Sequence, residues 1–232
     1  MPREKTLLAV GAHYDDCVFG VPGILLQAVA RHYRVVILSL IGDYSNWAPI
    51  GNRQQELIDG TKKICREYGV EMRYLDFLSH RFDVNDKTKL AVARAVADIE
   101  PDIALYLWRR DHHDDHVVAS QLSEIALRYA GPLLERQVKN ARFQFLYDNG
   151  PRHTIGFEPD TFVDVSDVWP TAIDWLGRFM ALVRNEPYES GKLDGAQQMK
   201  ETLAAYRGKT CGVRYAEALQ AANQYPQDIL TI

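Results

Sequence analysis

Short apolar runs alternate with amphipathic segments along the first 130 residues of the chain. Residues 6–12 (TLLAVGA) form the kind of continuous apolar run found in a parallel strand that is buried on both faces. Residues 20–32 instead place apolar side chains at helical spacing. The two patterns continue in turn, with strands predicted at 34–41, 72–75 and 103–108 and helices at 53–68, 85–100 and 117–129. This order predicts an α/β fold, a Rossmann-like, doubly wound and mostly parallel sheet with helices on both faces.

After Gly131 the alternation weakens and the predicted elements become mixed. The pattern predicts strands at 143–147 and 161–165 and helices at 168–183, 196–206 and 215–222. Segment 148–159 holds two prolines and two glycines, so we expect an irregular loop there. Because the sequence shows no linker, we predict one domain. It would span residues 1–232, with a Rossmann-like core at 1–130 and C-terminal elements at 131–232 that complete the pocket.

Composition narrows the class of protein. Hydrophobic residues make up 47% and charged residues 25%, which is typical of a soluble globular protein. The formal net charge of −4 argues against the broad basic surface of a nucleic-acid-binding protein. Three scattered cysteines favour a reducing compartment. The apolar run at 6–12 is too short for an export signal or a membrane span, so we expect a cytoplasmic protein without membrane association.

Polar clusters follow three of the predicted parallel strands. Residues 13–16 (HYDD) follow the first strand, residues 42–45 (GDYS) follow the second, and residues 111–116 (DHHDDH) follow the strand that ends at Trp108. In open α/β sheets, ligands bind beyond the carboxyl ends of the strands. We therefore expect these clusters to meet at one rim of the sheet, although they are far apart in the sequence.

Three side chains of these clusters suit a divalent metal ion. A catalytic zinc takes three ligands from His, Asp and Glu and leaves a fourth position for water. His13 and Asp16 lie three residues apart on a tight strand-to-helix turn, and His116, at the start of a helix, can supply the third ligand. The sequence predicts zinc here, and Fe²⁺ or Co²⁺ suits the same ligands.

Neighbouring residues in the same clusters can transfer protons. Zinc lowers the pKa of its bound water to about 7, and Asp15 is then the candidate general base. His113 can act as the acid or oxyanion donor, with Asp115 available to orient its ring. A simpler interpretation is that Asp15 or Asp16 only caps a helix, but two such clusters on one rim disfavour it.

The two outer clusters resemble the signatures of a known family. Residues 12–17 (AHYDDC) look like the Ala-His-Pro-Asp-Asp-Glu motif of the LmbE/PIG-L family, the zinc-dependent N-acetylglucosamine de-N-acetylases. Residues 111–116 resemble its second signature, His-Pro-Asp-His after a short lead that contains Asp. Further segments resemble the family in order and spacing, including the Gly-Asp pair at 42–43, Arg53 with Glu56, and residues 162–166 and 215–219.

The resemblance implies a role for each matching residue. The zinc ligands would be His13, Asp16 and His116. Asp15 would be the general base, and His113, with Asp115 behind it, would stabilise the tetrahedral oxyanion and help the amine leave. Arg53 and Asp43 would contact the substrate in the pocket.

This chain departs from the family motifs at several positions. Tyr14 replaces the usual proline and would either contact the substrate or cover the site. Cys17 replaces a glutamate, and Asp114 replaces the proline of the second signature. His80 and His153 have the pattern of surface or loop residues.

The family reaction is hydrolysis of an N-acyl group, usually acetyl, from an amino sugar. We therefore expect a small N-acylated amino sugar or glycoconjugate as the partner, and no nucleic acid or membrane. Two alternatives stay open: an amidase that acts on a thiol conjugate or another non-sugar acyl amide, and a metal- or sugar-binding protein without catalysis. A dinucleotide-binding protein is disfavoured, because the first turn has no Gly-x-Gly-x-x-Gly. The sequence leaves open whether the chain forms a homo-oligomer.

Overall fold

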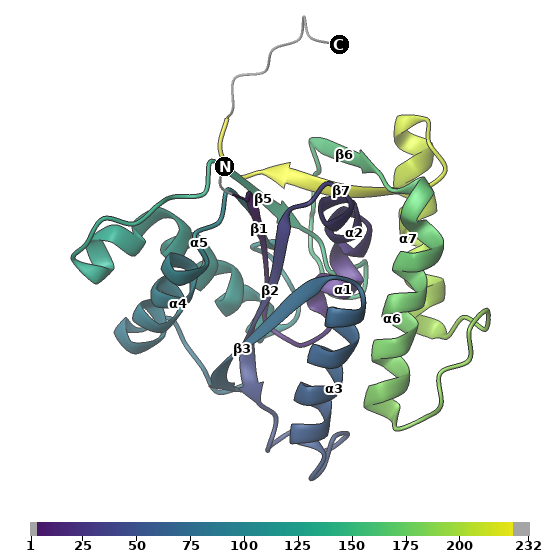
Figure 1. Cartoon of the computed structure of the whole chain (residues 1–232), viewed down its shortest axis with the longest axis horizontal. Helices are drawn as coiled ribbons and strands as arrows, with labels where there is room; N and C mark the ends of the chain where they lie inside the picture. The colour runs from purple at the N-terminus through teal and green to yellow at the C-terminus, as the bar shows by residue number, and fades with distance from the viewer. Residues whose placement is uncertain (1–3, 225–232) are drawn as a thin grey trace, which may run out of the picture.

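Within residues 4–224, the part of the chain described by this computed structural model, seven strands form one sheet (Figure 1). The ends of the predicted domain, residues 1–3 and 225–232, lie outside the described residues. The strands are β1 (Thr6–Gly11), β2 (Arg34–Asp43), β3 (Val70–Leu78), β4 (Ile103–Leu107), β5 (Phe143–Tyr147), β6 (Thr161–Asp164) and β7 (Ala216–Ala221). They lie in the order β3-β2-β1-β4-β5-β7-β6. In this described sheet, β7 alone runs in the direction opposite to the other six strands.

Helices cover both faces of the sheet. They are α1 (Asp16–Gly20), α2 (Pro22–Ala30), α3 (Gln54–Glu67), α4 (Asp86–Ile99), α5 (Asp114–Leu134), α6 (Trp169–Arg184) and α7 (Gly195–Cys211), with a short 3₁₀ helix at Ser166–Val168. Helices α4 and α5 pack together on one side, whereas α2, α3, α6 and α7 lie on the other (Figure 1). The predicted α/β, mostly parallel and doubly wound architecture is confirmed.

Strand β1 is the centre of the molecule. All six of its residues are buried, as expected for an apolar strand that is covered on both faces. It pairs in parallel with β2 on one side and β4 on the other, so the strand order reverses at β1 and β4. That reversal creates a crevice at the carboxyl ends of the two strands, the usual position of a ligand in this class of sheet.

The C-terminal segment contains one wrong prediction. The sequence pattern predicts a helix at 215–222, but Ala216–Ala221 forms strand β7 between β5 and β6. Alanine, glutamate and leucine favour a helix only by intrinsic propensity. Here pairing with two strands overrides that propensity, and Glu217 is buried at the N-terminus of α2, where its carboxylate accepts from the Gly23 and Ile24 amides at 3.0 and 2.8 Å.

Two helix boundaries differ from the sequence pattern in ways that matter for the site. Helix α5 begins at Asp114 rather than at residue 117, so His116 lies within its first turn. The short helix α1 was not predicted, and the helix expected at 20–32 is observed after it as α2, with Pro22 at its first position. Proline is favoured there because the first helical amide needs no partner within the helix.

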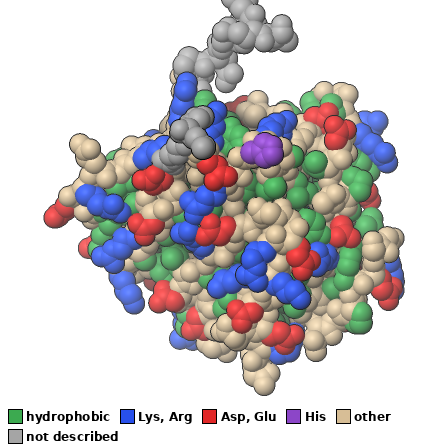
Figure 2. All heavy atoms as spheres, viewed as in Figure 1, with side chains coloured by type: hydrophobic (Ala, Val, Ile, Leu, Met, Phe, Trp, Pro, Cys, Tyr) green, Lys and Arg blue, Asp and Glu red, His purple; other side chains and the backbone are tan. Residues whose placement is uncertain are grey.

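The surface in view mixes the two signs of charge. In Figure 2, Lys and Arg side chains are interspersed with Asp and Glu, and this face shows no continuous basic patch. No helix among residues 4–224 is long and apolar enough to cross a membrane. The absence of nucleic-acid and membrane partners stays a prediction.

We expect Glu217→Gln to destabilise the fold. The Glu217 carboxylate lies 3.2 Å from Lys200 Nζ, and both side chains are almost inaccessible to solvent. Removing one charge leaves the other buried and unpaired, which costs about 3–5 kcal/mol of the free energy of unfolding. Urea denaturation measures the loss.

The matched control is Glu186→Gln, because Glu186 is 61% exposed in its pair with Arg184 and should contribute under about 1 kcal/mol. Equal losses in both variants would contradict this role of Glu217.

Candidate active site

The turn after β1 brings His13 and Asp16 to the same point. The His13 amide donates to Asp16 Oδ2 at 2.7 Å, which closes the turn between the strand and α1. Gly11 ends the strand, and a Cβ atom added there would lie 2.8 Å from Asp16 Cβ. The close approach of the Asp16 side chain therefore depends on a glycine at position 11.

His116, from the first turn of α5, completes a group of three possible metal ligands. Its Nε2 atom lies 3.2 Å from His13 Nδ1 and 3.2 Å from Asp16 Oδ1, and His13 Nδ1 lies 3.6 Å from Asp16 Oδ2. Ligands at zinc-to-nitrogen and zinc-to-oxygen distances around a tetrahedral ion are about 3.3–3.5 Å apart. The spacing of these three side chains therefore fits a zinc-sized ion.

The other nitrogen of each ring faces a second carboxylate. His13 Nε2 lies 3.1 Å from Asp115 Oδ2, and His116 Nδ1 lies 3.0 Å from Asp111 Oδ2. Both carboxylates are almost fully buried. Such contacts fix the ring orientation and tautomer of a metal-binding histidine and increase its basicity.

The electrostatic field at this point favours a positive charge. Burial alone would lower the pKa of His13, but Asp115 and Asp16 raise it to about 9. Burial likewise opposes protonation of His116, whose pKa Asp16 and Asp111 nevertheless raise to about 10. A divalent cation bound between the rings would supply the positive charge in place of the two protons.

Asp15 is available for chemistry. It occupies the position before α1, yet its side chain makes no capping hydrogen bond, so the capping interpretation does not account for it. Burial and the neighbouring Asp16 carboxylate raise the pKa of Asp15 to about 6. Its side chain lines the cavity that also contains His13 and His116.

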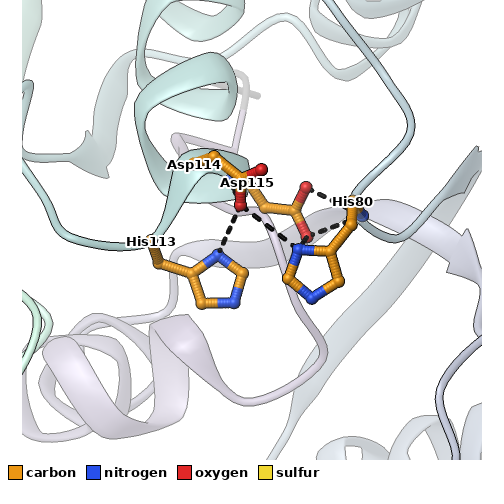
Figure 3. Close-up of side chains that lie close together, drawn as sticks. All are labelled: His80, His113, Asp114 and Asp115. Carbon is orange, nitrogen blue, oxygen red and sulfur yellow. Dashed lines mark hydrogen bonds and ion pairs between the residues drawn. The ribbon is translucent and has the colours of Figure 1, made fainter.

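His113 lines the same cavity and stacks on His116, with ring centroids 4.7 Å apart. Burial, together with the charges of His13 and His116, lowers its pKa to about 4. The carboxylate beside its Nδ1 atom is Asp114, at 3.4 Å, rather than the predicted Asp115 (Figure 3). Asp114 Oδ1 also lies 3.2 Å from His80 Nδ1, so one oxygen faces two rings.

The structure gives Asp115 different partners from those predicted. Besides His13, it accepts hydrogen bonds from the His80 amide at 3.0 and 3.1 Å and from Ser79 Oγ at 3.2 Å. Figure 3 shows its carboxylate turned toward His80. Asp115 therefore orients a candidate metal ligand and ties the segment after β3 to the start of α5.

Sequence reasoning missed three polar residues of the site. His80 and His153 lie in loops, as the sequence pattern indicates, and both also line the cavity, which the sequence pattern did not indicate. Asn149 donates to Asp16 Oδ1 at 2.6 Å. The place of His80 in the sequence could have indicated its role, because it follows β3 at the rim of the sheet where the other polar clusters lie. His153 and Asn149 lie in the irregular loop, where no periodicity indicates the direction of a side chain.

Among the residues that the structure describes, two further groups of side chains have ligand atoms close enough together for a metal ion. One consists of His80, His113, Asp114 and Asp115, which Figure 3 shows, and the other of Asp111, His116 and His153. Both share members with the contacts described above. In the group of His13, Asp16 and His116, both histidine rings have their other nitrogen next to a second carboxylate, from Asp115 and Asp111.

The predicted substrate residues have different positions. Tyr14 lines the cavity. Arg53 instead donates to the Val183 carbonyl at 2.8 Å and lies 3.4 Å from the Leu182 carbonyl, at the end of α6. Asp43 accepts from the Ser45 amide at 2.9 Å, and neither Arg53 nor Asp43 is among the described residues that line the cavity.

The cavity has a volume of about 310 Å³. Its polar lining consists of five histidines, two aspartates, a serine and an asparagine: His13, His80, His113, His116, His153, Asp15, Asp16, Ser79 and Asn149. Its remaining lining is aromatic or aliphatic: Tyr14, Phe19, Tyr44, Trp47, Met180, Ala196 and Met199. A small molecule in the cavity would therefore contact both the candidate metal ligands and an apolar wall.

Residues 8–127, slightly more than half of the chain, match the family model described as PIG-L, GlcNAc-PI de-N-acetylase. The chain belongs to the PIG-L family. In this deacetylase family member, the clusters after β1 and β4 lie within the matched region, whereas α6 and α7 lie beyond it.

Solved structures share the fold over most of the chain. The 4-carboxy-2-hydroxymuconate hydratase GalB from Pseudomonas putida is 17% identical, with a TM-score of 0.79 over 97% of this chain and 98% of that one. A conserved protein from Thermus thermophilus is 23% identical, with a TM-score of 0.78 over 96% and 97%. The N,N'-diacetylchitobiose deacetylase from Pyrococcus horikoshii is 17% identical, with a TM-score of 0.77 over 94% and 83%. At these identities the likeness shows the fold alone.

Replacing Asp111 should weaken metal binding without unfolding the protein. We expect Asp111→Asn to lower zinc affinity about 10–100-fold, because the variant loses the carboxylate that faces His116 Nδ1. Competition with a chromogenic chelator measures the affinity. Asp114→Asn is the matched control, because it removes a charge from the same segment but leaves the Asp111 and Asp115 contacts in place. A similar loss of affinity in both variants would show that total charge matters rather than the contact.

Proposed function

We propose that this chain is a metal-dependent hydrolase that removes an N-acyl group, most simply acetyl, from a small amine. The observation that carries the proposal is the spacing of His13, Asp16 and His116 at tetrahedral ligand distances, beside an acid that caps no helix. Membership of a deacetylase family supports it. Zinc is the proposed ion, and Fe²⁺ or Co²⁺ suits the same donors.

The three ligands would leave one side of the ion open toward the cavity that they line. When bound, a divalent ion supplies Lewis acidity that lowers the pKa of water to about 7. Asp15 would accept a proton from the attacking water, for which an uncapped carboxylate in the cavity is suited.

His113 is the proposed partner on the oxyanion and leaving group. Its ring lies 4.7 Å, centroid to centroid, from both His13 and His116, so it borders the position where the amide carbonyl would sit. Asp114 Oδ1 lies 3.4 Å from its Nδ1 atom. Its Nε2–H would donate to the oxygen that becomes negative, and the ring would help the proton that Asp15 takes from the water to reach the departing amine.

The cavity disfavours two other functions. The hydratase with the same fold is named for a carboxylate substrate. The described lining of this cavity contains Asp15 and Asp16 but no lysine or arginine, so a carboxylate would meet like charge. A binding protein without catalysis would have no use for an uncapped acid next to three metal ligands.

The substrate class, the cellular location and the oligomeric state are inferred from the sequence. The family favours an N-acetylated amino sugar or glycoconjugate, and the amidase alternative, with a thiol conjugate or another non-sugar amide, involves the same chemistry at the metal. The cytoplasmic location and a homo-oligomeric state stay predictions.

Asp15→Asn should abolish most turnover without emptying the metal site. We expect amine release to fall by at least about 10²–10⁴-fold, the usual contribution of a general base, while metal content stays near one ion per chain. Release is followed with an amine-reactive fluorophore and metal content by plasma emission spectroscopy.

Asp167→Asn, in the short 3₁₀ helix, is the matched control that removes an exposed carboxylate. It should keep full activity. An Asp15→Asn enzyme with wild-type activity would contradict the assignment of the base.

A further inference from the structure

The apolar part of the cavity is continuous. The rings of Tyr14, Tyr44 and Trp47 lie about one ring diameter apart, with centroid separations of 5.9–6.2 Å. Phe19 from α1, Met180 from α6 and Met199 from α7 line the same cavity. Tyr14 and Tyr44 are buried, whereas Phe19, Trp47, Met180 and Met199 are partly exposed. Large apolar side chains that are partly exposed in a concave site are characteristic of surfaces that receive an apolar ligand.

Three polar atoms in the lining outside the catalytic cluster have partners within the protein, whereas Asn149 Oδ1 has none among the described residues. Ser79 Oγ donates to Asp115 at 3.2 Å, and Asn149 Nδ2 donates to Asp16 at 2.6 Å. The Tyr44 hydroxyl accepts from the Tyr14 amide at 3.0 Å. A sugar ring needs hydrogen-bond partners around its edge as well as a surface on which to stack, because unmet hydroxyls lose their hydration on binding.

Two residues that were predicted to contact the substrate, Arg53 and Asp43, do not line the cavity. The Arg53 guanidinium binds carbonyls at the end of α6, as described above, and Asp43 lies outside the cavity. Met180, Ala196 and Met199 instead line the cavity that also contains the candidate metal ligands. These three residues belong to α6 and α7, which lie outside the part of the chain that matches the family model.

We propose that the substrate is an N-acyl amide whose amine carries an uncharged, apolar or aromatic group, and that this group packs against Phe19, Trp47, Met180 and Met199. The inference rests on the proposed hydrolase function and specifies its substrate class. A bare amino sugar would be a poor substrate, because Phe19, Met180 and Met199 offer its hydroxyls apolar surface and no side-chain nitrogen or oxygen.

The experiment compares three acetyl amides with the zinc-loaded wild-type chain: N-acetyl-2-phenylethylamine, N-acetylglucosamine and N,N'-diacetylchitobiose. We expect kcat/KM for the aromatic amide to exceed that for either sugar by at least about tenfold, the scale on which a hydrophobic pocket discriminates. Faster release from a sugar would overturn the inference and leave the hydrolase function intact.

If no amide is hydrolysed, the hydrolase function fails, and binding decides the substrate class separately. Titration calorimetry with the same three compounds then measures affinity for the zinc-loaded protein. Tighter binding of the aromatic amide supports the apolar wall as its site, and tighter binding of a sugar, or no binding of the aromatic amide, overturns the inference.

Substitutions at Met199 and Met180 test whether the aromatic group of the amide packs against these side chains. Met199→Gln, which keeps the length of the side chain but adds an amide, should lower kcat/KM or affinity for the aromatic amide about tenfold, whereas Met199→Leu should preserve it. Met180→Gln provides a second position if the first variant is unstable by thermal melting. An unchanged preference in both glutamine variants would contradict the inference.

Discussion

Two buried imidazole rings, each between two carboxylates, determine the geometry of the site. His13 lies between Asp16 and Asp115, and His116 lies between Asp16 and Asp111. Buried carboxylates are costly unless a positive charge accompanies them. The cluster therefore requires a cation or protonated rings, and the spacing of the ring nitrogens and the Asp16 oxygens suits a metal ion.

The fold supplies this cluster from two distant parts of the sequence. Strands β1 and β4 are neighbours in the sheet, so the turn after β1 and the start of α5 meet at the reversal of strand order. The family model covers this half of the molecule. Helices α6 and α7, which lie beyond it, provide the methionines of the cavity, so the cavity lining combines side chains from the matched region with side chains from outside it.

The sequence was informative where local rules control the structure. The apolar run of β1 and the polar residues after each strand were sufficient to predict the sheet and the rim at which His13, Asp16 and His116 meet. Long-range packing decided the rest. Strand β7 forms against helix propensity because β5 and β6 flank it. Arg53 lies outside the cavity because its guanidinium donates to carbonyls at the end of α6, about 130 residues later in the sequence.

The most direct measurement is anomalous diffraction at the zinc absorption edge from crystals grown with zinc. We expect the strongest peak between His13 Nδ1, His116 Nε2 and the Asp16 carboxylate. A strongest peak at His80, His113, Asp114 and Asp115, or among Asp111, His116 and His153, would contradict the assigned ligands. The absence of any peak at saturating zinc would contradict a metal-dependent hydrolase.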